Sequence, residues 1–145
     1  RNTSGLLIFA KNDKAYDSLL LGFKEGFIQK EYVAYVHNAS FKCANLLLEN
    51  YLLKDEKDGY SKIYDNYVEG SQKVITEISV EKTNKELDYA ILNVKIHTGK
   101  THQIRSVLSY ISHPINIIIS YYSCQVKKYY CVAFFDNAIY LREKM

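Results

Sequence analysis

The stretch that decides the fold is His97-Thr98-Gly99-Lys100-Thr101-His102-Gln103-Ile104-Arg105. Before it, residues 89–96 alternate between two faces, with Ala, Leu, Val and Ile on one of them, which is typical of a strand. After it, four apolar residues between positions 104 and 111 recur at helical spacing and predict an amphipathic helix. The sequence therefore predicts a strand that passes into a helix at Gly99.

The same stretch is rich in groups that bind anions. It holds two His, a Lys and an Arg, and no Asp or Glu occurs between Tyr89 and Phe135. Helix N-termini attract anions, and an Arg holds a carboxylate through paired hydrogen bonds. Because His102 and Arg105 lie off the apolar stripe, we expect them to face a site for an anion or a carboxylate. An ordinary junction with solvated charges is the alternative.

The remaining pattern predicts a sheet with few helices. Strands are predicted at residues 6–9 (buried), 30–36, 61–68, 74–80, 89–96, 129–135 and 138–141. Residues 44–53 fit either a strand or a helix, and residues 55–59 and 81–86 are predicted turns. This composition of elements predicts an α+β class, with a mixed, mostly antiparallel sheet and two or three packed helices.

A helix is predicted between the first two strands. Asp13 is its expected N-cap and Gly26 its expected end. Its apolar residues at helical spacing are Tyr16, Leu19, Leu20 and Phe23. With 145 residues, the whole chain fits one domain over 1–145.

Composition narrows the class of partner. The net charge is only +3, but 14 of the 16 acids lie in residues 1–88, so the second part is basic, as expected of a nucleic-acid face. Three Cys without a disulfide pattern indicate a cytoplasmic protein. The apolar run 115–119 is too short to span a bilayer, so no membrane partner is expected. Chance asymmetry of charge is the alternative to a nucleic-acid face.

Other chemistries fit less well. The four His and three Cys match no zinc spacing, so no metal is expected. A P-loop is excluded because Val94 stands where its first Gly is required. No elbow motif supports a Ser or Cys nucleophile, although one sequence does not exclude such a residue.

Four ordered segments resemble one known family, the RluA-type RNA pseudouridine synthases. The resemblance covers residues 1–115, and residues 116–145 form a divergent tail. Its motifs are Arg1-Asn2-Thr3-Ser4-Gly5, Lys30-Glu31-Tyr32, Thr98–Arg105 and His113-Pro114-Ile115. Lys54-Asp55 resembles a Lys-Asp pair that the family carries between its second and third motifs. The resemblance implies the pseudouridine synthase catalytic fold, with its N-terminal part missing.

The resemblance also implies an enzyme that isomerises uridine to pseudouridine in ribosomal or transfer RNA. An Asp carboxylate starts the detachment of uracil, a Tyr lies beside the base and accepts a proton, and an Arg holds the Asp ionised. Carried over, the catalytic residues are Tyr32 and Arg105. A flipped-out nucleotide and its flanking RNA would be held by basic and polar side chains. These are expected to be Arg1, Lys30, Lys100, His102 and Gln103. No cofactor is implied, and a monomer is expected.

Three departures from the family pattern qualify these expectations. The motif Asp would stand immediately before Arg1, so these 145 residues are expected to lack the nucleophile and to be inactive alone. Lys100 replaces the usual Arg, which retains the charge but not a forked donor. The likeness fades after Ile115, which fits either a diverged tail strand or a shifted reading frame. A non-catalytic RNA-binding module and an open reading frame without a stable fold are the alternatives to the enzyme.

Overall fold

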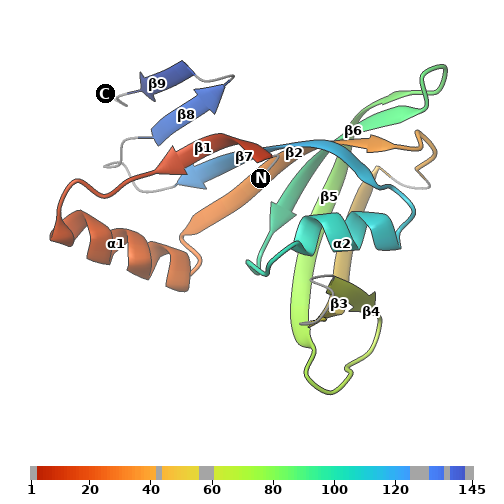
Figure 1. Cartoon of the computed structure of the whole chain (residues 1–145), viewed down its shortest axis with the longest axis horizontal. Helices are drawn as coiled ribbons and strands as arrows, with labels where there is room; N and C mark the ends of the chain where they lie inside the picture. Colours follow the sequence, from red (N-terminus) through yellow and green to blue (C-terminus); the bar gives the residue numbers. More distant parts are fainter. Residues whose placement is uncertain (1–2, 42–43, 56–60, 125–130, 136–137, 143–145) are drawn as a thin grey trace.

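The computed structural model describes residues 3–41, 44–55, 61–124, 131–135 and 138–142 (Figure 1). Its elements are β1 (Thr3–Ile8), α1 (Asp13–Lys24), β2 (Ile28–His37), β3 (Asn45–Lys54), β4 (Ser61–Tyr64), β5 (Gln72–Asn84), β6 (Tyr89–Ile96), α2 (Gln103–Tyr110), β7 (Ile115–Cys124), β8 (Cys131–Phe135) and β9 (Ala138–Arg142). The α+β class is confirmed, with two helices in the described ranges.

All described strands form one sheet, in the order β4-β3-β5-β6-β2-β7-β1-β8-β9. Among the described pairs, β1 and β7 run parallel and every other pair is antiparallel, as the sequence predicts. β2 lies between β6 and β7, and Tyr32 is opposite Val94 on one side and Ser120 on the other. The sheet therefore places the middle of β2 near its centre, with hydrogen-bonded neighbours on both sides.

The helix α2 closes the main hydrophobic core. Its residues Ile104, Val107 and Leu108 are buried, and they pack in one cluster with Ala34 and Val36 of β2 and with apolar residues of β3 to β6. Figure 1 shows α1 and α2 on the same side of the sheet. The predicted apolar stripe of α2 is confirmed, because side chains at helical spacing face the sheet.

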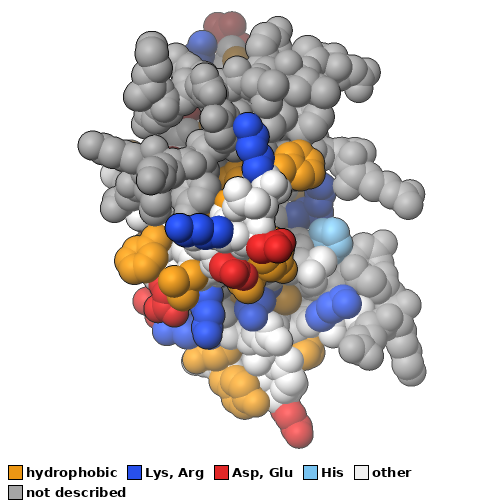
Figure 2. All heavy atoms as spheres, turned by 90° about the vertical axis from the view of Figure 1, so that its left-hand side faces the viewer, with side chains coloured by type: hydrophobic (Ala, Val, Ile, Leu, Met, Phe, Trp, Pro, Cys, Tyr) orange, Lys and Arg blue, Asp and Glu red, His pale blue; other side chains and the backbone are white. Residues whose placement is uncertain are grey.

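The helix α1 is less well covered. It packs mainly on β2, where Gly22 brings the helix so close that an added Cβ would lie 3.0 Å from Ile28 Cδ1. Leu19 is buried, but Tyr16 and Leu20 of the predicted stripe are 58% and 56% exposed. Apolar side chains accordingly lie among charged ones on the face of the molecule that Figure 2 shows. The predicted stripe is thus only partly buried, because α1 covers essentially one strand.

The ends of α1 are close to those predicted. Asn12, rather than Asp13, is the N-cap, and its side chain accepts a hydrogen bond from the Ala15 N–H at 2.9 Å. Asp13 instead lies in the first turn, where a carboxylate favours the helix dipole. Gly26, with φ of +75°, takes the left-handed conformation that follows many helices. The predicted end is confirmed and the predicted cap is one residue off.

Three strand predictions need correction. β7 is missed by the sequence patterns, because the mostly apolar segment 115–119 shows no regular alternation, and a short apolar segment fits a buried strand or a buried helix equally well. β5 continues to Asn84 through a bulge between Val80 and Lys82, so the predicted turn at 81–86 is wrong. The weak strand predicted at 61–68 ends at Tyr64, and the ambiguous segment 44–53 lies almost entirely in the strand β3 (Asn45–Lys54).

Smaller differences lie at the chain ends and in one loop. β1 ends at Ile8, and Phe9, predicted within the buried strand, is 60% exposed. Most of the turn predicted at 55–59 falls outside the described residues, as do positions 129–130 of a predicted strand. β8 and β9 match the rest of the two closing strands that the sequence predicts.

Candidate functional site

The turn between β6 and α2 is fixed by one buried amide. Gln103 is only 1% exposed, and its Oε1 accepts hydrogen bonds from Thr98 Oγ1 at 2.9 Å and from the Lys100 N–H at 3.2 Å. Its Nε2 donates to the carbonyl oxygen of Ile75 at 3.2 Å and to Thr76 Oγ1 at 3.0 Å. The Ile75 N–H in turn donates to Thr98 Oγ1 at 3.1 Å. The turn is therefore bound to β5.

The helix begins in an unusual way. His102 occupies the N-cap with φ of +59° and ψ of +13°, and its side chain makes no capping hydrogen bond. A left-handed conformation is uncommon outside Gly, although His is among the residues enriched there. Because Ile104 points into the core, the exposed side chains of His102 and Arg105 lie on the outer side of the turn. The predicted placement of these two residues off the apolar stripe is confirmed.

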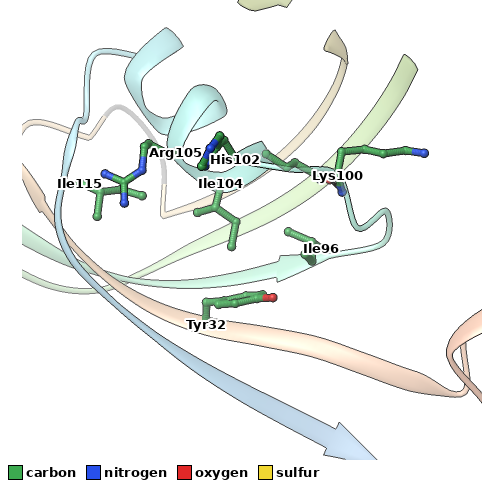
Figure 3. Close-up of a pocket in the computed structure, with 8 residues that line it drawn as sticks. Tyr32, Ile96, Lys100, His102, Ile104, Arg105 and Ile115 are labelled. Atoms are coloured by element: carbon green, nitrogen blue, oxygen red, sulfur yellow. Dashed lines mark hydrogen bonds between the residues drawn. The ribbon is translucent and has the colours of Figure 1, made fainter. Parts of the chain in front are cut away.

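A pocket of about 170 Å³ lies between this turn and the sheet. We call it the Tyr32 pocket, and its lining residues are Tyr32, Ile96, Lys100, His102, Gln103, Ile104, Arg105 and Ile115. Figure 3 shows Tyr32 on β2, across the pocket from Ile104 and Arg105 of α2. Residues from three strands, one helix and the turn thus surround one cavity. Its lining combines a phenol with several basic side chains.

The charge of the pocket is one-sided. Within the described ranges, its lining includes Lys100, His102 and Arg105, and no Asp or Glu. Within the part of the chain that the structure describes, Arg105 forms no ion pair. The sequence suggested no acid near this stretch, yet the fold brings Glu77 of β5 to 3.4 Å from His97 Nε2. That pair is outside the lining, so the excess of positive charge within the pocket remains.

One of the predicted RNA-binding residues, Lys30, has other surroundings. Lys30 lies on β2, and its Nζ is 5.4 Å from the centre of the Phe23 ring. An added Cβ at Gly99 would lie only 2.6 Å from that Nζ. Lys30 therefore packs against the turn between β6 and α2 (residues 97–102), which we call the Gly99 turn. It lines no part of the Tyr32 pocket. Arg1 lies outside the described residues.

Gln103 differs most from its predicted role. Because both ends of its amide are engaged within the protein and the residue is buried, its side chain offers no free group for RNA. The sequence signal for RNA contact came from its position in the motif, whereas its bonding partners lie on β5. An interior anchor of the turn fits the observed contacts better than an RNA contact does.

The motif His113-Pro114-Ile115 is largely structural. His113 is 6% exposed and stacks on Phe41, with ring centroids 3.6 Å apart. Its Nδ1 lies 3.0 Å from the carbonyl oxygen of Asn38, and because a carbonyl only accepts, Nδ1 carries the proton. Ile115, two residues on, begins β7 and lines the Tyr32 pocket. The motif thus fixes the start of the strand that forms one wall.

One hydrogen-bonded group that the sequence did not suggest holds the other end of α2. Tyr110 donates its hydroxyl to Asp65 Oδ2 at 2.9 Å, and Asp65 Oδ1 accepts from Asn50 Nδ2 at 3.2 Å. The hydrogen bond to Asp65, followed by burial and the carboxylate's charge, raises the pKa of Tyr110 above its ordinary value. These residues lie far apart in sequence, so no local pattern marks them.

Neither described helix is long and apolar enough to cross a membrane. Across the same described ranges, no three His, Cys, Asp or Glu side chains gather closely enough to hold a metal ion.

Comparison with known proteins gives the class of this fold and site. A family model described as RNA pseudouridylate synthase matches residues 1–110. Ribosomal large subunit pseudouridine synthase D of Blochmanniella floridana is 32% identical over 115 residues, covering 79% of this chain and 34% of that protein. Ribosomal large subunit pseudouridine synthase C of Pasteurella multocida is 35% identical over 117 residues, with the same coverage of 79% and 34%. The chain thus spans about a third of the length of these relatives.

Solved structures share the fold. Human RNA Pseudouridylate Synthase Domain Containing 1 superimposes with a TM-score of 0.68 at 18% identity, over 94% of this chain and 62% of that one. Human RNA Pseudouridylate Synthase Domain Containing 4 gives a TM-score of 0.64 at 19% identity, over 78% and 45%. The chain belongs to the RNA pseudouridine synthases of the RluA type, a family of isomerases that modify RNA.

Proposed function

We propose that this chain is part of an enzyme that converts uridine to pseudouridine in ribosomal or transfer RNA. The observation that carries the proposal is the Tyr32 pocket, in which Tyr32 and Arg105 face one cavity. In this proposal the aromatic face of Tyr32 supports a flipped-out base and its hydroxyl accepts a proton. Lys100 and His102 bind the flanking phosphates, and Gln103 positions the turn that carries them.

Arg105 is proposed to hold the carboxylate that attacks the nucleotide. Its guanidinium has no ion-pair partner among the described residues, and a forked donor is suited to hold a carboxylate ionised. β1 runs parallel to β7, with Thr3 opposite Ile118. β7 begins at Ile115, which lines the pocket. Because β1 runs in the same direction beside β7, the N-terminal end of β1 lies within a few residues of the pocket. We propose that an Asp immediately before Arg1 supplies the carboxylate that Arg105 holds.

The proposal assigns no nucleophile to these 145 residues. We therefore expect them to be inactive alone, and we expect the longer protein with its Asp to be active. Release of tritium from RNA labelled at carbon 5 of uridine measures the reaction directly. Turnover by the 145 residues would overturn the assignment of the nucleophile, whereas an inactive longer protein that still binds RNA would favour a non-catalytic RNA-binding module.

The variant Arg105→Ala in the longer protein distinguishes a role of Arg105 in turnover from a role in RNA binding. We expect a loss of turnover of at least about a hundredfold, the scale of removing one preorganised charged donor. RNA binding should persist, because Lys100 and His102 still face the phosphates. Arg105→Lys is the matched control: it retains the charge but not the fork, so it should bind RNA as well as the unmodified protein and still lack turnover. Full activity of Arg105→Ala would show that Arg105 has another role.

The site contains no group that suggests a cofactor, and the proposal needs none. We propose a monomer that works in the cytoplasm, where its RNA substrates are made. The extent of the domain over 1–145, including the tail after 115, stays a prediction.

A further inference from the structure

A second cavity lies on the other side of the Gly99 turn. It measures about 380 Å³ and is lined by Leu52 and Lys54 of β3, Gly70, Gln72 of β5 and residues 99–101. We call it the Lys54 cavity. Lys100 lines both cavities, so the turn that carries it is their common wall. In Figure 3 the Lys100 side chain points away from Tyr32, which leaves its ammonium on the side opposite the phenol.

The lining of the Lys54 cavity is chemically suited to an anion. It includes the two cationic side chains Lys54 and Lys100, the amide of Gln72 and the hydroxyl of Thr101, and no acid among the residues that the structure describes. Two ammonium groups on separate elements attract a phosphate, and neutral hydrogen-bonding groups beside them suit a sugar. The nearby Thr98 hydroxyl and Lys100 N–H are bonded to Gln103, so this wall is held in place before any ligand binds.

The two cavities differ in size in a way that matches two parts of an RNA chain. The Tyr32 pocket, at about 170 Å³, is smaller than the roughly 300–1,000 Å³ usual for sites that enclose a small molecule. The Lys54 cavity, at about 380 Å³, falls within that range. One cavity therefore has room for a base alone, and its neighbour has room for a ribose and phosphate.

We propose that the Lys54 cavity binds the ribose–phosphate backbone of the nucleotide next to the one whose base enters the Tyr32 pocket. This inference rests on the proposed function, because it takes the ligand of the Tyr32 pocket to be an RNA base. The Gly99 turn then lies against the RNA between two consecutive nucleotides. Lys54 and Lys100 contact, from two sides, the phosphate that links these two nucleotides. This contact fixes which nucleotide is presented to Tyr32.

The first test compares two lysine variants of equal charge change. Lys54→Gln removes a lining ammonium, and Lys62→Gln removes an exposed lysine on β4 that lines neither cavity. Binding of a fluorescently labelled single-stranded RNA with one central uridine is measured by anisotropy at several salt concentrations. We expect Lys54→Gln to weaken binding about three- to tenfold and to reduce the salt slope by about 0.7, the value for one phosphate of a single strand. Equal effects of both variants would overturn the inference.

The second test locates the phosphate. The same RNA is prepared with one neutral methylphosphonate linkage, placed in turn at each position around the uridine. If Lys54 binds a phosphate beside the target, Lys54→Gln should cause no further loss on the RNA whose neutral linkage replaces that phosphate. An effect of Lys54→Gln that persists on every RNA of the series would overturn the inference.

The outcome for the cavity and the outcome for the enzyme are distinguishable. If Lys54→Gln leaves RNA binding unchanged while the longer protein still modifies uridine, the cavity proposal fails and the proposed function stands. If no RNA binds to the protein at all, both fail. Thermal melts of both lysine variants check that any loss of binding does not come from unfolding.

Discussion

The two helices of this fold carry similar apolar patterns but have different surroundings. Along α2, Ile104, Val107 and Leu108 are all buried, and its first residue, Gln103, is bonded to β5. Along α1, only part of the stripe is covered, and Leu20 is 56% exposed. The difference shows that helical spacing predicts a helix but not how much of the sheet the helix covers. The candidate site lies at the helix that is anchored to several strands.

The largest difference is expected for a leucine on each helix. Leu108→Ala removes a fully buried side chain and should lower the free energy of unfolding by about 2–5 kcal/mol. Leu20→Ala replaces an exposed residue of α1 and should change the free energy of unfolding by no more than about 0.5 kcal/mol. Urea unfolding measures both. Because Leu108→Ala could prevent folding, Ile104→Val is a milder core variant, expected to cost about 0.5–1.5 kcal/mol. Similar costs for the variants on the two helices would contradict the comparison.

A smaller loss is expected when the start of α2 is released from β5. Gln103→Leu keeps the approximate volume but leaves the Thr76 hydroxyl, which is fully buried, without the amide that donates to it. An unsatisfied buried polar group costs about 1–3 kcal/mol, so stability should fall by that amount. Hydrogen exchange at the Lys100 N–H should quicken, since this group also donates to Gln103.

The matched control replaces both partners. In the double variant Gln103→Leu with Thr76→Val, the buried Thr76 hydroxyl is removed together with the amide that donates to it, so part of the lost stability should return. The remainder stays lost, because the Thr98 hydroxyl and the Lys100 N–H still lack the Gln103 oxygen that accepts from them. If the double variant is as unstable as the sum of the single ones, the hydrogen bond between these side chains is not what links α2 to β5.

The local part of this site follows from the sequence, and the long-range part does not. The strand over 89–96 and the helix after it were predictable because their signals repeat within a few residues. The cationic character of the turn was predictable from its residue types. The interior position of Gln103 was not, because Thr76 lies 27 residues away in sequence and comes near only when β5 pairs with β6.

The same reason explains the errors in the sheet. The first half of β7 is mostly apolar and shows no regular alternation, yet the strand pairs with both β2 and β1. The burial of α1 depended on how many strands lie beneath it, which no residue of the helix specifies. The resemblance to a known family supplied a prediction that periodicity could not, namely that Tyr32 and Arg105 lie together although they are far apart in sequence. Both do line the Tyr32 pocket.

The smallest effect concerns the far end of α2, where Tyr110 donates to Asp65. Since this hydrogen bond raises the pKa of Tyr110, the folded state favours the protonated phenol. The resulting stability is present below the ordinary tyrosine pKa of about 10 and is lost as the pH rises through the raised value. Tyr110→Phe should therefore be slightly less stable than the unmodified protein at pH 8.

The difference between the two proteins should disappear at higher pH. Urea unfolding between pH 8 and 11 measures this difference directly. Lys73, whose pKa is raised by its hydrogen bond to Glu49, loses its contribution over the same high-pH range in both proteins, so it cancels. A difference that stays constant up to pH 11 would show that the contact acts through packing of the ring. A difference that vanishes would show that a hydrogen bond holds the end of α2, as the buried amide of Gln103 holds its start.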